Sequence, residues 1–288
     1  MEDNSIIIEK SPELHKTTLI AGFEGWGNAL NISNAMLSYL IRKLKAEPFA
    51  RINPDHFYRY DENRPVVDIE DGILKTIDPP GGLFYTVDVP SDSSHLVLLK
   101  GDEPNLKWFR FAEDLSDFFK KLNISTFVSL GSMYDNVLHT DRIVSGFASK
   151  KELSSLLTKK NILQVNYNGP SSIHSILHSE CRKRDISCAS LWCHCPYYLQ
   201  GTTHYGLLSH IGEILSYIGN FSLDTEDLDK KWIELNQQIQ SVVENNPELQ
   251  KMIDELRKAK VRGSWEKIEE SIKKNGKVIP ISDFMKPA

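Results

Sequence analysis

The stretch that decides the fold of this chain reads Leu19-Ile20-Ala21-Gly22-Phe23-Glu24-Gly25-Trp26-Gly27-Asn28. An apolar run leads into closely spaced glycines, and a helical pattern follows from about 30 to 44, which predicts a strand, a turn and a helix. In an open α/β sheet such a turn lies at the carboxyl end of its strand, where ligands usually bind. The glycine order matches neither a dinucleotide-binding turn nor a Walker A loop, so the stretch indicates an architecture and names no substrate.

The alternation of strand and helix continues to about residue 222. We expect further strands at 49–52, 95–99, 126–130, 142–148 and 186–193, and further helices at 106–122, 151–159, 171–184 and 206–218. This order predicts an α/β fold with three layers, in which helices cover both faces of a mostly parallel sheet. The strand-like runs 72–77 and 83–87 flank Pro79-Pro80-Gly81-Gly82, and this turn signal predicts a hairpin that decorates the sheet.

The pattern changes after residue 221. A charged helix with a narrow apolar seam is followed by Asn246-Pro247, which ends it and suits the first turn of another helix. The apolar residues of the two helices are Leu228, Trp232, Leu235, Ile239 and Val242, then Leu249, Met252, Ile253 and Leu256. We therefore divide the chain into a core domain at 1–222, a helical hairpin at 223–260 that packs on the core or on a neighbouring subunit, and a loose tail at 261–288.

Composition restricts the class of protein. The 34 basic and 39 acidic residues give a net charge of −5, which argues against nucleic acid as the main partner. Four cysteines in 288 residues do not suggest a disulfide scaffold. No apolar run approaches the roughly 20 residues that span a bilayer, and the acidic N-terminus does not resemble a signal peptide. We expect a cytoplasmic protein with no membrane partner.

A cluster of cysteines and histidines raises the question of a metal site. Its members are Cys188, Cys193, His194, Cys195, His204 and His210. Alternation along a strand would place Cys193 and Cys195 on one face and His194 on the other, so these side chains would not converge on one ion. The spacing is not that of a zinc finger or ribbon. We therefore expect core cysteines and no metal.

Polar residues follow several predicted strands. Glu24 and Glu103 could face one crevice and shuttle protons or bind Mg²⁺, although Glu103 is better explained as stabilising the N-terminus of the helix that follows it. Asp135 and His139 follow the strand that ends at Gly131, where they could act as an acid or base or could hold their own loop. No Gly-x-Ser-x-Gly elbow is present.

Two further features belong to the same predicted edge. Trp26 lies in the glycine turn, where an indole could line a pocket, lie in a subunit interface or cover the local core. Gly169-Pro170-Ser171-Ser172 opens a helix, and the side chain of Ser171 or Ser172 could cap it. The carboxyl ends of parallel strands share one edge of a sheet, so these loops should meet there.

Several separated segments together resemble the proteasome-assembly-chaperone-2-like family of archaea and actinobacteria. The matching segments are 22–29, 49–58, 64–65, 101–108, 135–140, 169–173 and 189–198, and the stretch from Trp232 to Leu249 is similar to the bacterial members. Each motif is weak alone, but their order over residues 15–258 is fairly specific. The loops that carry Trp26, Glu103 and His139 fall on motifs that the family shares.

The resemblance implies a fold similar to nucleoside phosphorylases and hydrolases, and assembly into homo-oligomers. The eukaryotic members of the family are chaperones for proteasome α-subunits. Some other members are labelled ATP-dependent carboxylate–amine ligases, for which this sequence gives no support. Archaeal relatives can dock on proteasomes through a C-terminal tail with a penultimate tyrosine. This chain ends Phe284-Met285-Lys286-Pro287-Ala288 and lacks that tyrosine.

Two hypotheses follow. The first is a non-enzymatic, chaperone-like homo-oligomer, a trimer or larger, whose partners are other copies of the chain and proteasome subunits or another protein. The second is an enzyme of phosphorylase, hydrolase or ligase type that acts on a small molecule, and neither hypothesis assigns a cofactor. The candidate crevice residues are Glu24, Gly25, Trp26, Asn28, Glu103, Asp135, His139 and Gly169.

Overall fold

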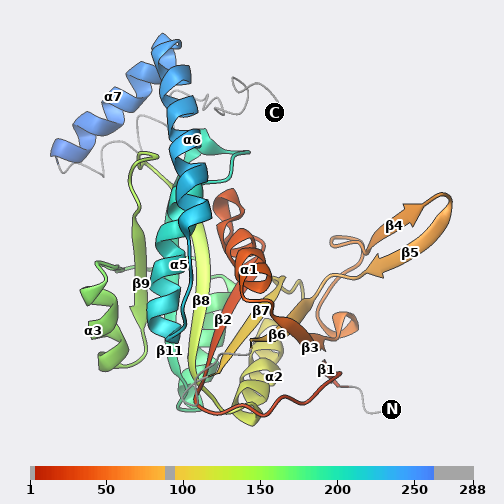
Figure 1. The fold of residues 1–288 in the computed structure, drawn as a ribbon. Helices are drawn as coiled ribbons and strands as arrows, with labels where there is room; N and C mark the ends of the chain where they lie inside the picture. Colours follow the sequence, from red (N-terminus) through yellow and green to blue (C-terminus); the bar gives the residue numbers. More distant parts are fainter. Residues whose placement is uncertain (1–3, 88–94, 263–288) are drawn as a thin grey trace.

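The computed structural model describes residues 4–87 and 95–262, and its centre is a nine-stranded sheet (Figure 1). In spatial order the strands are β1 (Ile6–Ile8), β3 (Glu47–Ile52), β6 (Gly82–Val87), β7 (Leu96–Asp102), β2 (Thr17–Glu24), β8 (Ile124–Asp135), β11 (Ser187–Pro196), β9 (Val144–Ala148) and β10 (Leu163–Gln164). β2 is central because its side chains from Thr17 to Phe23 are buried on both faces. Such a continuous apolar run is typical of a parallel strand covered by helices on both sides.

The sheet is parallel at its centre and mixed at its edges. β7, β2, β8 and β11 run parallel, whereas β6 and β3 pair antiparallel on one side and β9 pairs antiparallel with β11 on the other. The expectation of a mostly parallel sheet therefore holds for these four central strands and for the edge pair β9 and β10, which also run parallel. α3 forms the crossover that joins the parallel strands β9 and β10.

Helices cover both faces and complete the three predicted layers. α1 (Ile32–Lys43), α3 (Lys151–Lys159) and α5 (Tyr205–Gly219) bury apolar side chains in one core cluster, and α2 (Trp108–Lys121) and α4 (Ile173–Lys183) do so in another. α2 illustrates the cause, since its buried apolar residues recur at helical spacing on the side that faces the sheet. Short 3₁₀ turns occur at Ala29–Asn31, Pro54–His56 and Tyr197–Leu199.

The decorating hairpin has a different pairing from the one expected. β5 (Ile73–Asp78) pairs with β4 (Val66–Glu70), and the two form a separate ribbon, which we call the arm (Val66–Asp78). β6 instead joins the main sheet between β3 and β7. The turn of the hairpin is Asp71-Gly72, where both residues have positive φ, and Pro79-Pro80 leads from the arm into the sheet. The arm projects from the body (Figure 1).

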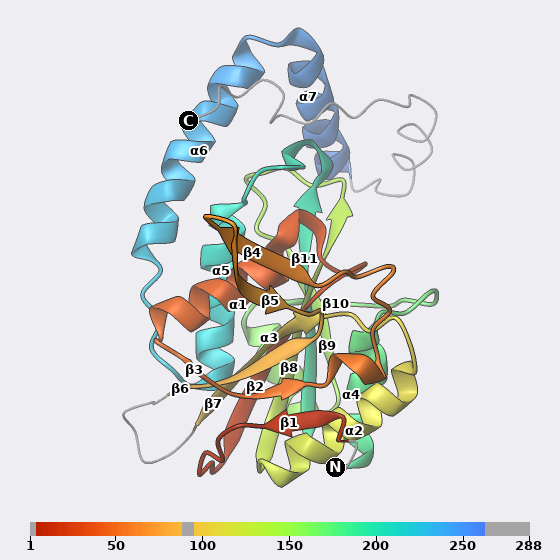
Figure 2. The same cartoon turned by 90° about the vertical axis from the view of Figure 1, so that its right-hand side faces the viewer.

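The C-terminal part forms the predicted helical hairpin. α6 (Glu226–Glu244) and α7 (Pro247–Arg262) follow α5 and form two successive helices joined by a tight turn (Figure 2). Their apolar stripes contribute to the same core cluster as α1 and α5. The predicted tail lies outside the described residues from 263 onward. Among the helices described, none combines the length and the apolar character needed to cross a membrane.

Candidate functional site

The glycine turn after β2 brings two loops into close contact. Gly25 has a φ of 144°, and a Cβ added there would lie 2.8 Å from the Cβ of Glu103. Gly27 lies against the indole of Trp192, which a Cβ would approach to 2.9 Å. Between these glycines Trp26 points outward with 68% of its surface exposed. The glycines therefore permit tight packing beneath the turn, while the tryptophan is held on the surface.

Glu103 links three segments that are distant in sequence. Its backbone N–H donates to the carbonyl of Glu24 (2.7 Å), and its Oε2 accepts from the N–H of Trp26 (3.3 Å). Its Oε1 accepts from the N–H of Ile173, the first residue of α4 (2.8 Å). Glu103 thus stabilises a helix N-terminus, as predicted, but the helix is α4 rather than the helix that follows it in the chain.

This contact also corrects the expected capping of α4. Ser172 occupies the N-cap position, yet within the described chain its hydroxyl makes no cap hydrogen bond, and Ser171 Oγ donates to the carbonyl of Ser172 (2.8 Å). The carboxylate of Glu103 takes the role of the missing cap. Gly169 precedes this helix end and packs against the ring of Tyr167.

Asn28 organises the start of α1. It is buried, and its Nδ2 donates to Glu24 Oε2 (2.7 Å) and to Asn31 Oδ1 (2.9 Å). Its Oδ1 accepts from the backbone N–H (2.9 Å) and the hydroxyl (2.6 Å) of Ser33. Leu30 and Asn31 have positive φ, which explains why α1 starts at Ile32, two residues later than expected. All the hydrogen-bonding groups of Asn28 are used to hold the loop.

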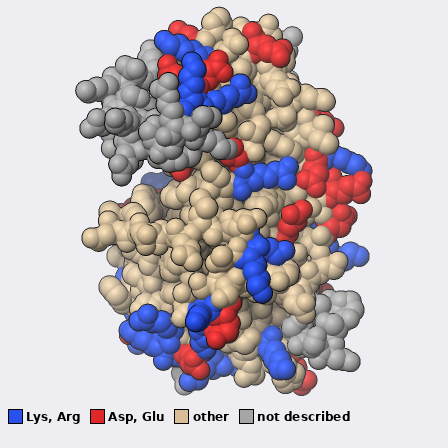
Figure 3. Space-filling view, turned by 90° about the vertical axis from the view of Figure 1, so that its left-hand side faces the viewer, with Lys and Arg blue, Asp and Glu red and all other residues tan. Residues whose placement is uncertain are grey.

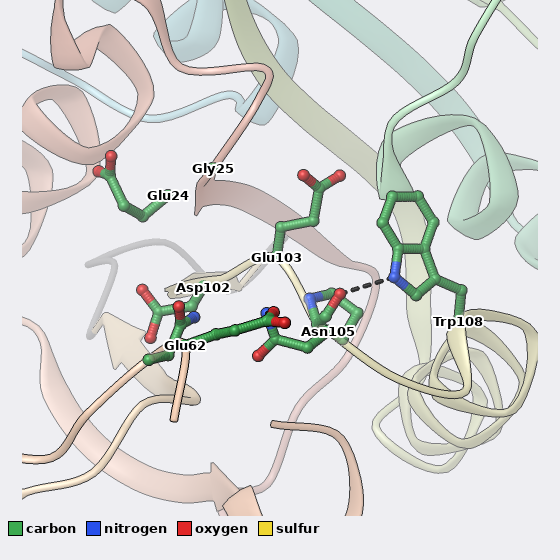
Figure 4. Close-up of a pocket in the computed structure, with 9 residues that line it drawn as sticks. Glu24, Gly25, Glu62, Asp102, Glu103, Asn105 and Trp108 are labelled. Carbon is green, nitrogen blue, oxygen red and sulfur yellow. Dashed lines mark hydrogen bonds between the residues drawn. The ribbon is translucent and has the colours of Figure 1, made fainter. Parts of the chain in front are cut away.

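A pocket of about 390 Å³ lies beside the glycine turn, and we call it the acidic pocket (Figure 4). Its lining residues are Glu24, Gly25, Glu62, Asn63, Asp102, Glu103, Pro104, Asn105 and Trp108. Burial raises the pKa of Asp102, although the N–H of Gly81 donates to its carboxylate (2.9 Å). Four carboxylates around one pocket produce a negative potential that favours cationic groups and repels phosphate.

The structure does not place Asp135 in the acidic pocket. Its Oδ2 lies 2.7 Å from His194 Nδ1, and His194 Nε2 lies 2.8 Å from Ser145 Oγ. Burial acts to raise the pKa of Asp135, but the hydrogen bonds from His194 and from the N–H of Asn136 hold it below its ordinary value. A carboxylate, an imidazole and a hydroxyl in this order resemble the relay of a serine hydrolase, but Ser145 is only 4% exposed.

His139 lies in a third environment, close to α6. The hydroxyl of Tyr198 is 2.6 Å from its backbone nitrogen and 2.8 Å from its Nδ1. The ring of His139 is 6.3 Å from that of Trp232, which stacks on His204 at 4.9 Å. Burial, and secondarily Arg257, lower the pKa of His139 to about 4, so the ring is neutral at pH 7. It is a buried contact between the core and the helical hairpin.

The sequence therefore identified one edge of the sheet but not the grouping of its side chains. Glu24, Gly25 and Glu103 line the acidic pocket, Trp26 and Asn28 adjoin it, and neither Asp135 nor His139 belongs to its lining. Sequence reasoning missed Glu62 and Asn63, which come from a loop without a motif. It also missed Asp102 and Asn105, which lie close to the singled-out Glu103 in the segment 101–108.

The alternation argument for the cysteines is confirmed. Cys193 and Cys195 are buried in the core cluster that contains α1 and α5, whereas His194 faces the other side with Asp135 and Ser145. Across the described ranges 4–87 and 95–262, no group of three or more His, Cys, Asp or Glu side chains could hold a metal ion.

Solved structures share this fold over nearly their whole length. A Corynebacterium glutamicum protein of unknown function matches with a TM-score of 0.80 and 19% identity, covering 90% of this chain and 98% of that one. A PAC2 family protein from Streptomyces avermitilis matches at 0.71 and 26% identity, covering 78% and 95%. A proteasome-assembly chaperone homologue from Mycobacterium tuberculosis matches at 0.74 and 24% identity, covering 82% and 99%.

The sequence comparison agrees with the structural one. No curated protein matches the chain significantly. The family model described as the PAC2 family matches residues 19–243, which is more than half of the chain and includes most of β2, every later strand and part of the helical hairpin. The chain belongs to the PAC2 family.

Proposed function

We propose that this chain is a non-enzymatic, chaperone-like interaction protein that forms homo-oligomers and binds proteasome subunits in the cytoplasm. Membership of the PAC2 family supports a chaperone-like role, as does the likeness to the proteasome-assembly chaperone homologue from Mycobacterium tuberculosis. One observation carries the proposal. At one edge of the sheet, large apolar side chains are exposed, whereas the polar side chains there are engaged in hydrogen bonds that hold the loops.

The exposed side chains form an apolar rim, which we define as Trp26, Leu106 and Phe109. Each follows a residue that lines the acidic pocket, and Trp26 and Phe109 are 68% and 70% exposed. Burying a large apolar side chain that was exposed to water lowers the free energy by about 1.5–3 kcal/mol. Aromatic residues dominate the binding energy of protein interfaces. An apolar rim around an acidic pocket suits a protein partner that presents an apolar segment with a basic residue.

The electrostatics of the pocket argue against two of the enzyme alternatives. A phosphorylase and an ATP-dependent ligase both need to hold phosphate groups, usually with basic side chains or a helix N-terminus. Here the N-terminus of α4 is occupied by the carboxylate of Glu103, and the acidic pocket has no basic residue in its lining. The side chains at the strand ends therefore repel the anionic group that such enzymes bind.

Binding to a purified α-type proteasome subunit tests the proposal. Light scattering should give a trimer or larger for the chain alone, and titration with the subunit should give saturable binding. The double variant Trp26→Ser with Phe109→Ser should weaken binding at least tenfold without changing the melting temperature, because both side chains are outside the core. Ile233→Ser, on the exposed side of α6, is the matched control. A monomer, or no binding by the unaltered chain, would overturn the proposal.

The second candidate function is a small-molecule hydrolase, favoured by the relay of Asp135, His194 and Ser145. Incubation with a fluorophosphonate probe distinguishes the two functions, because the hydroxyl of an active serine attacks the phosphorus, displaces fluoride and keeps the phosphonyl group. Under the first proposal Ser145 stays unlabelled, since its hydroxyl is buried and serves to orient His194. Labelling of the unaltered chain, with its loss in Ser145→Ala and in His194→Gln, would establish the hydrolase instead.

A further inference from the structure

The acidic pocket and the apolar rim form one surface that combines negative charge with exposed aromatic rings. The carboxylates belong to Glu24, Glu62, Asp102 and Glu103. Glu62 pairs with Arg59 (2.7 Å), whereas within residues 4–87 and 95–262 no ion pair involves the other three. On the face shown in Figure 3, by contrast, Lys and Arg side chains lie beside Asp and Glu side chains. The pocket and its rim therefore match a segment that joins positive charge to apolar residues.

The end of the chain contains such a segment. It reads Lys273-Lys274-Asn275-Gly276-Lys277-Val278-Ile279-Pro280-Ile281, and we call it the tail segment (273–281). It lies outside the described residues. It has three lysines and no acidic residue, and four apolar residues follow the last lysine directly. Its charge of +3 is opposite in sign to that of the pocket, and its apolar residues have a matching surface in the rim.

α7 ends on the side of the sheet where the pocket lies. Arg257, near the end of α7, is close enough to His139 to lower the pKa of that residue, and α7 lies beyond the end of β11 in Figure 2. His139 follows β8 and Glu103 follows β7, and only β2 separates these two strands. Neighbouring strands are about 4.8 Å apart, so the two loops start about 10 Å from each other.

The length of chain after α7 is sufficient to reach the pocket. Eleven residues lead from Arg262, the end of α7, to Lys273. An extended chain of this length spans up to about 36 Å, which is several times the separation of the two loops. A segment tethered in this way has an effective concentration on the order of millimolar at its site, so even weak contacts keep it bound.

We propose that the tail segment binds the acidic pocket and the apolar rim of its own chain, with the lysines toward the carboxylates and the apolar residues on Trp26 and Phe109. This contact does not depend on the identity of any partner. Its consequence does rest on the proposed function: the tail segment competes with the proteasome subunit for the rim. A partner then binds only when its own contacts are strong enough to displace the tail segment.

Cross-linking within the full-length chain tests the contact. The four native cysteines are buried, so thiols introduced at the surface react selectively. Glu113→Cys lies one turn after Phe109 on α2 and outside the pocket lining, and Ser282→Cys follows the tail segment directly. We expect a short bismaleimide to link these thiols within one chain at least tenfold faster than in a control chain, in which Ile233→Cys on the exposed side of α6 replaces Glu113→Cys.

Charge reversal distinguishes a bound tail segment from one that only passes near the pocket. Lys273→Glu, Lys274→Glu and Lys277→Glu, added to the chain with both cysteines, should slow the linking at least fivefold, and high salt should slow it in the unreversed chain. The same rate in the reversed chain would overturn the inference. So would a link between two differently tagged chains with one cysteine each, because the tail segment would then bind a second copy.

Binding of the proteasome subunit separates failure of this inference from failure of the proposed function. Since the reversed lysines no longer hold the tail segment on the rim, we expect the charge-reversed chain to bind the subunit at least threefold more tightly than the unaltered chain. If the linking depends on charge and no subunit binds, the tail contact stands and the proposed function fails. If the subunit binds and the linking ignores charge, the proposed function stands and the tail contact is overturned. Equal affinities of the two chains would overturn the competition.

Discussion

The two hairpins of this molecule have similar apolar content and opposite environments. In α6 and α7 the apolar stripe is buried on the core of the same chain, with Leu228, Leu235, Ile239, Leu249 and Ile253 all 7% exposed or less. In the arm every aliphatic side chain is more than half exposed. Apolar residues thus indicate that an element will be covered, but they do not tell whether its own chain or another one covers it.

Polar contacts with the core distinguish the helical hairpin from the arm. The hydroxyl of Tyr39 in α1 donates to Asp227 Oδ1 (2.7 Å) and lies 2.8 Å from the carbonyl oxygen of Asp224, and Lys43 pairs with Asp227 (3.0 Å). Burial, together with Asp227, raises the pKa of Tyr39 to about 12, so this donor stays protonated at all ordinary pH values. The helical hairpin is fixed to the core by these contacts at its first turn, whereas the arm is joined to the body by Pro79-Pro80 and the segment before Val66.

The largest expected difference between the hairpins is in stability. Ile239→Ala removes a fully buried side chain between α6 and the core, and we expect a loss of about 2–5 kcal/mol in the free energy of unfolding, measured with urea. The matched change Ile77→Ala, in the arm, should alter it by less than about 0.5 kcal/mol when the chain is dilute enough to be monomeric. Equal losses would show that the arm is covered within its own chain.

Acid should release the helical hairpin and leave the arm unaffected. His204 stacks on Trp232 of α6, and its Nδ1 accepts from the N–H of Leu207, a role that only the neutral ring can fill. Burial, and secondarily His139 and Arg142, lower the pKa of His204 to about 3. The unfolded chain binds this proton near pH 6.5, so stability is present above about pH 6.5 and is lost toward pH 3, by on the order of 3 kcal/mol at pH 4.

Tryptophan fluorescence during urea unfolding at pH 7 and at pH 4.5 measures this loss. His204→Asn retains an acceptor for the start of α5 and removes the titration, so its stability should be lower at pH 7 but should fall less on acidification. His15→Asn, at an exposed position, is the control that removes a histidine without this environment. An unchanged pH slope in His204→Asn would contradict the assignment.

The sequence predicted those parts of the fold that depend on residues close together along the chain. The strand, glycine turn and helix at 19–44 were recognisable because burial on both faces and glycine spacing are local patterns. The exposure of Trp26 follows from its place in a turn at a strand end. The two-helix pattern after residue 221 was equally local, since its seam recurs every three or four residues.

What could not be predicted depends on loops that cross the molecule. Glu103 reaches Ile173, 70 residues away, and nothing in either segment specifies that contact. His139 follows a strand that ends at the expected edge, but its loop turns toward α6 and the side chain becomes buried against Tyr198. The arm is a different case, because Asp71-Gly72 is itself a strong hairpin signal, whereas Pro79-Pro80 only leads from the arm into the sheet.

The smallest expected effect concerns this turn. Asp71 and Gly72 have φ values of 50° and 76°, as in the tight hairpin turns that match the twist of their strands. A methyl group at Gly72 would meet open space, so Gly72→Ala introduces backbone strain of about 1 kcal/mol and no clash.

Because the arm contributes to neither core cluster, this strain should be invisible in global unfolding of the dilute chain and visible as faster amide exchange confined to Val66–Asp78. Asp71→Asn is the matched control, since asparagine tolerates the same φ. If the homo-oligomer proposed above covers the arm, protection of these amides should rise with protein concentration, and Gly72→Ala should lower that concentration dependence. Protection that is independent of concentration would instead mean that the ribbon is stable without a second copy. The two hairpins would then differ only in how far their apolar side chains are exposed, and not in which chain covers them.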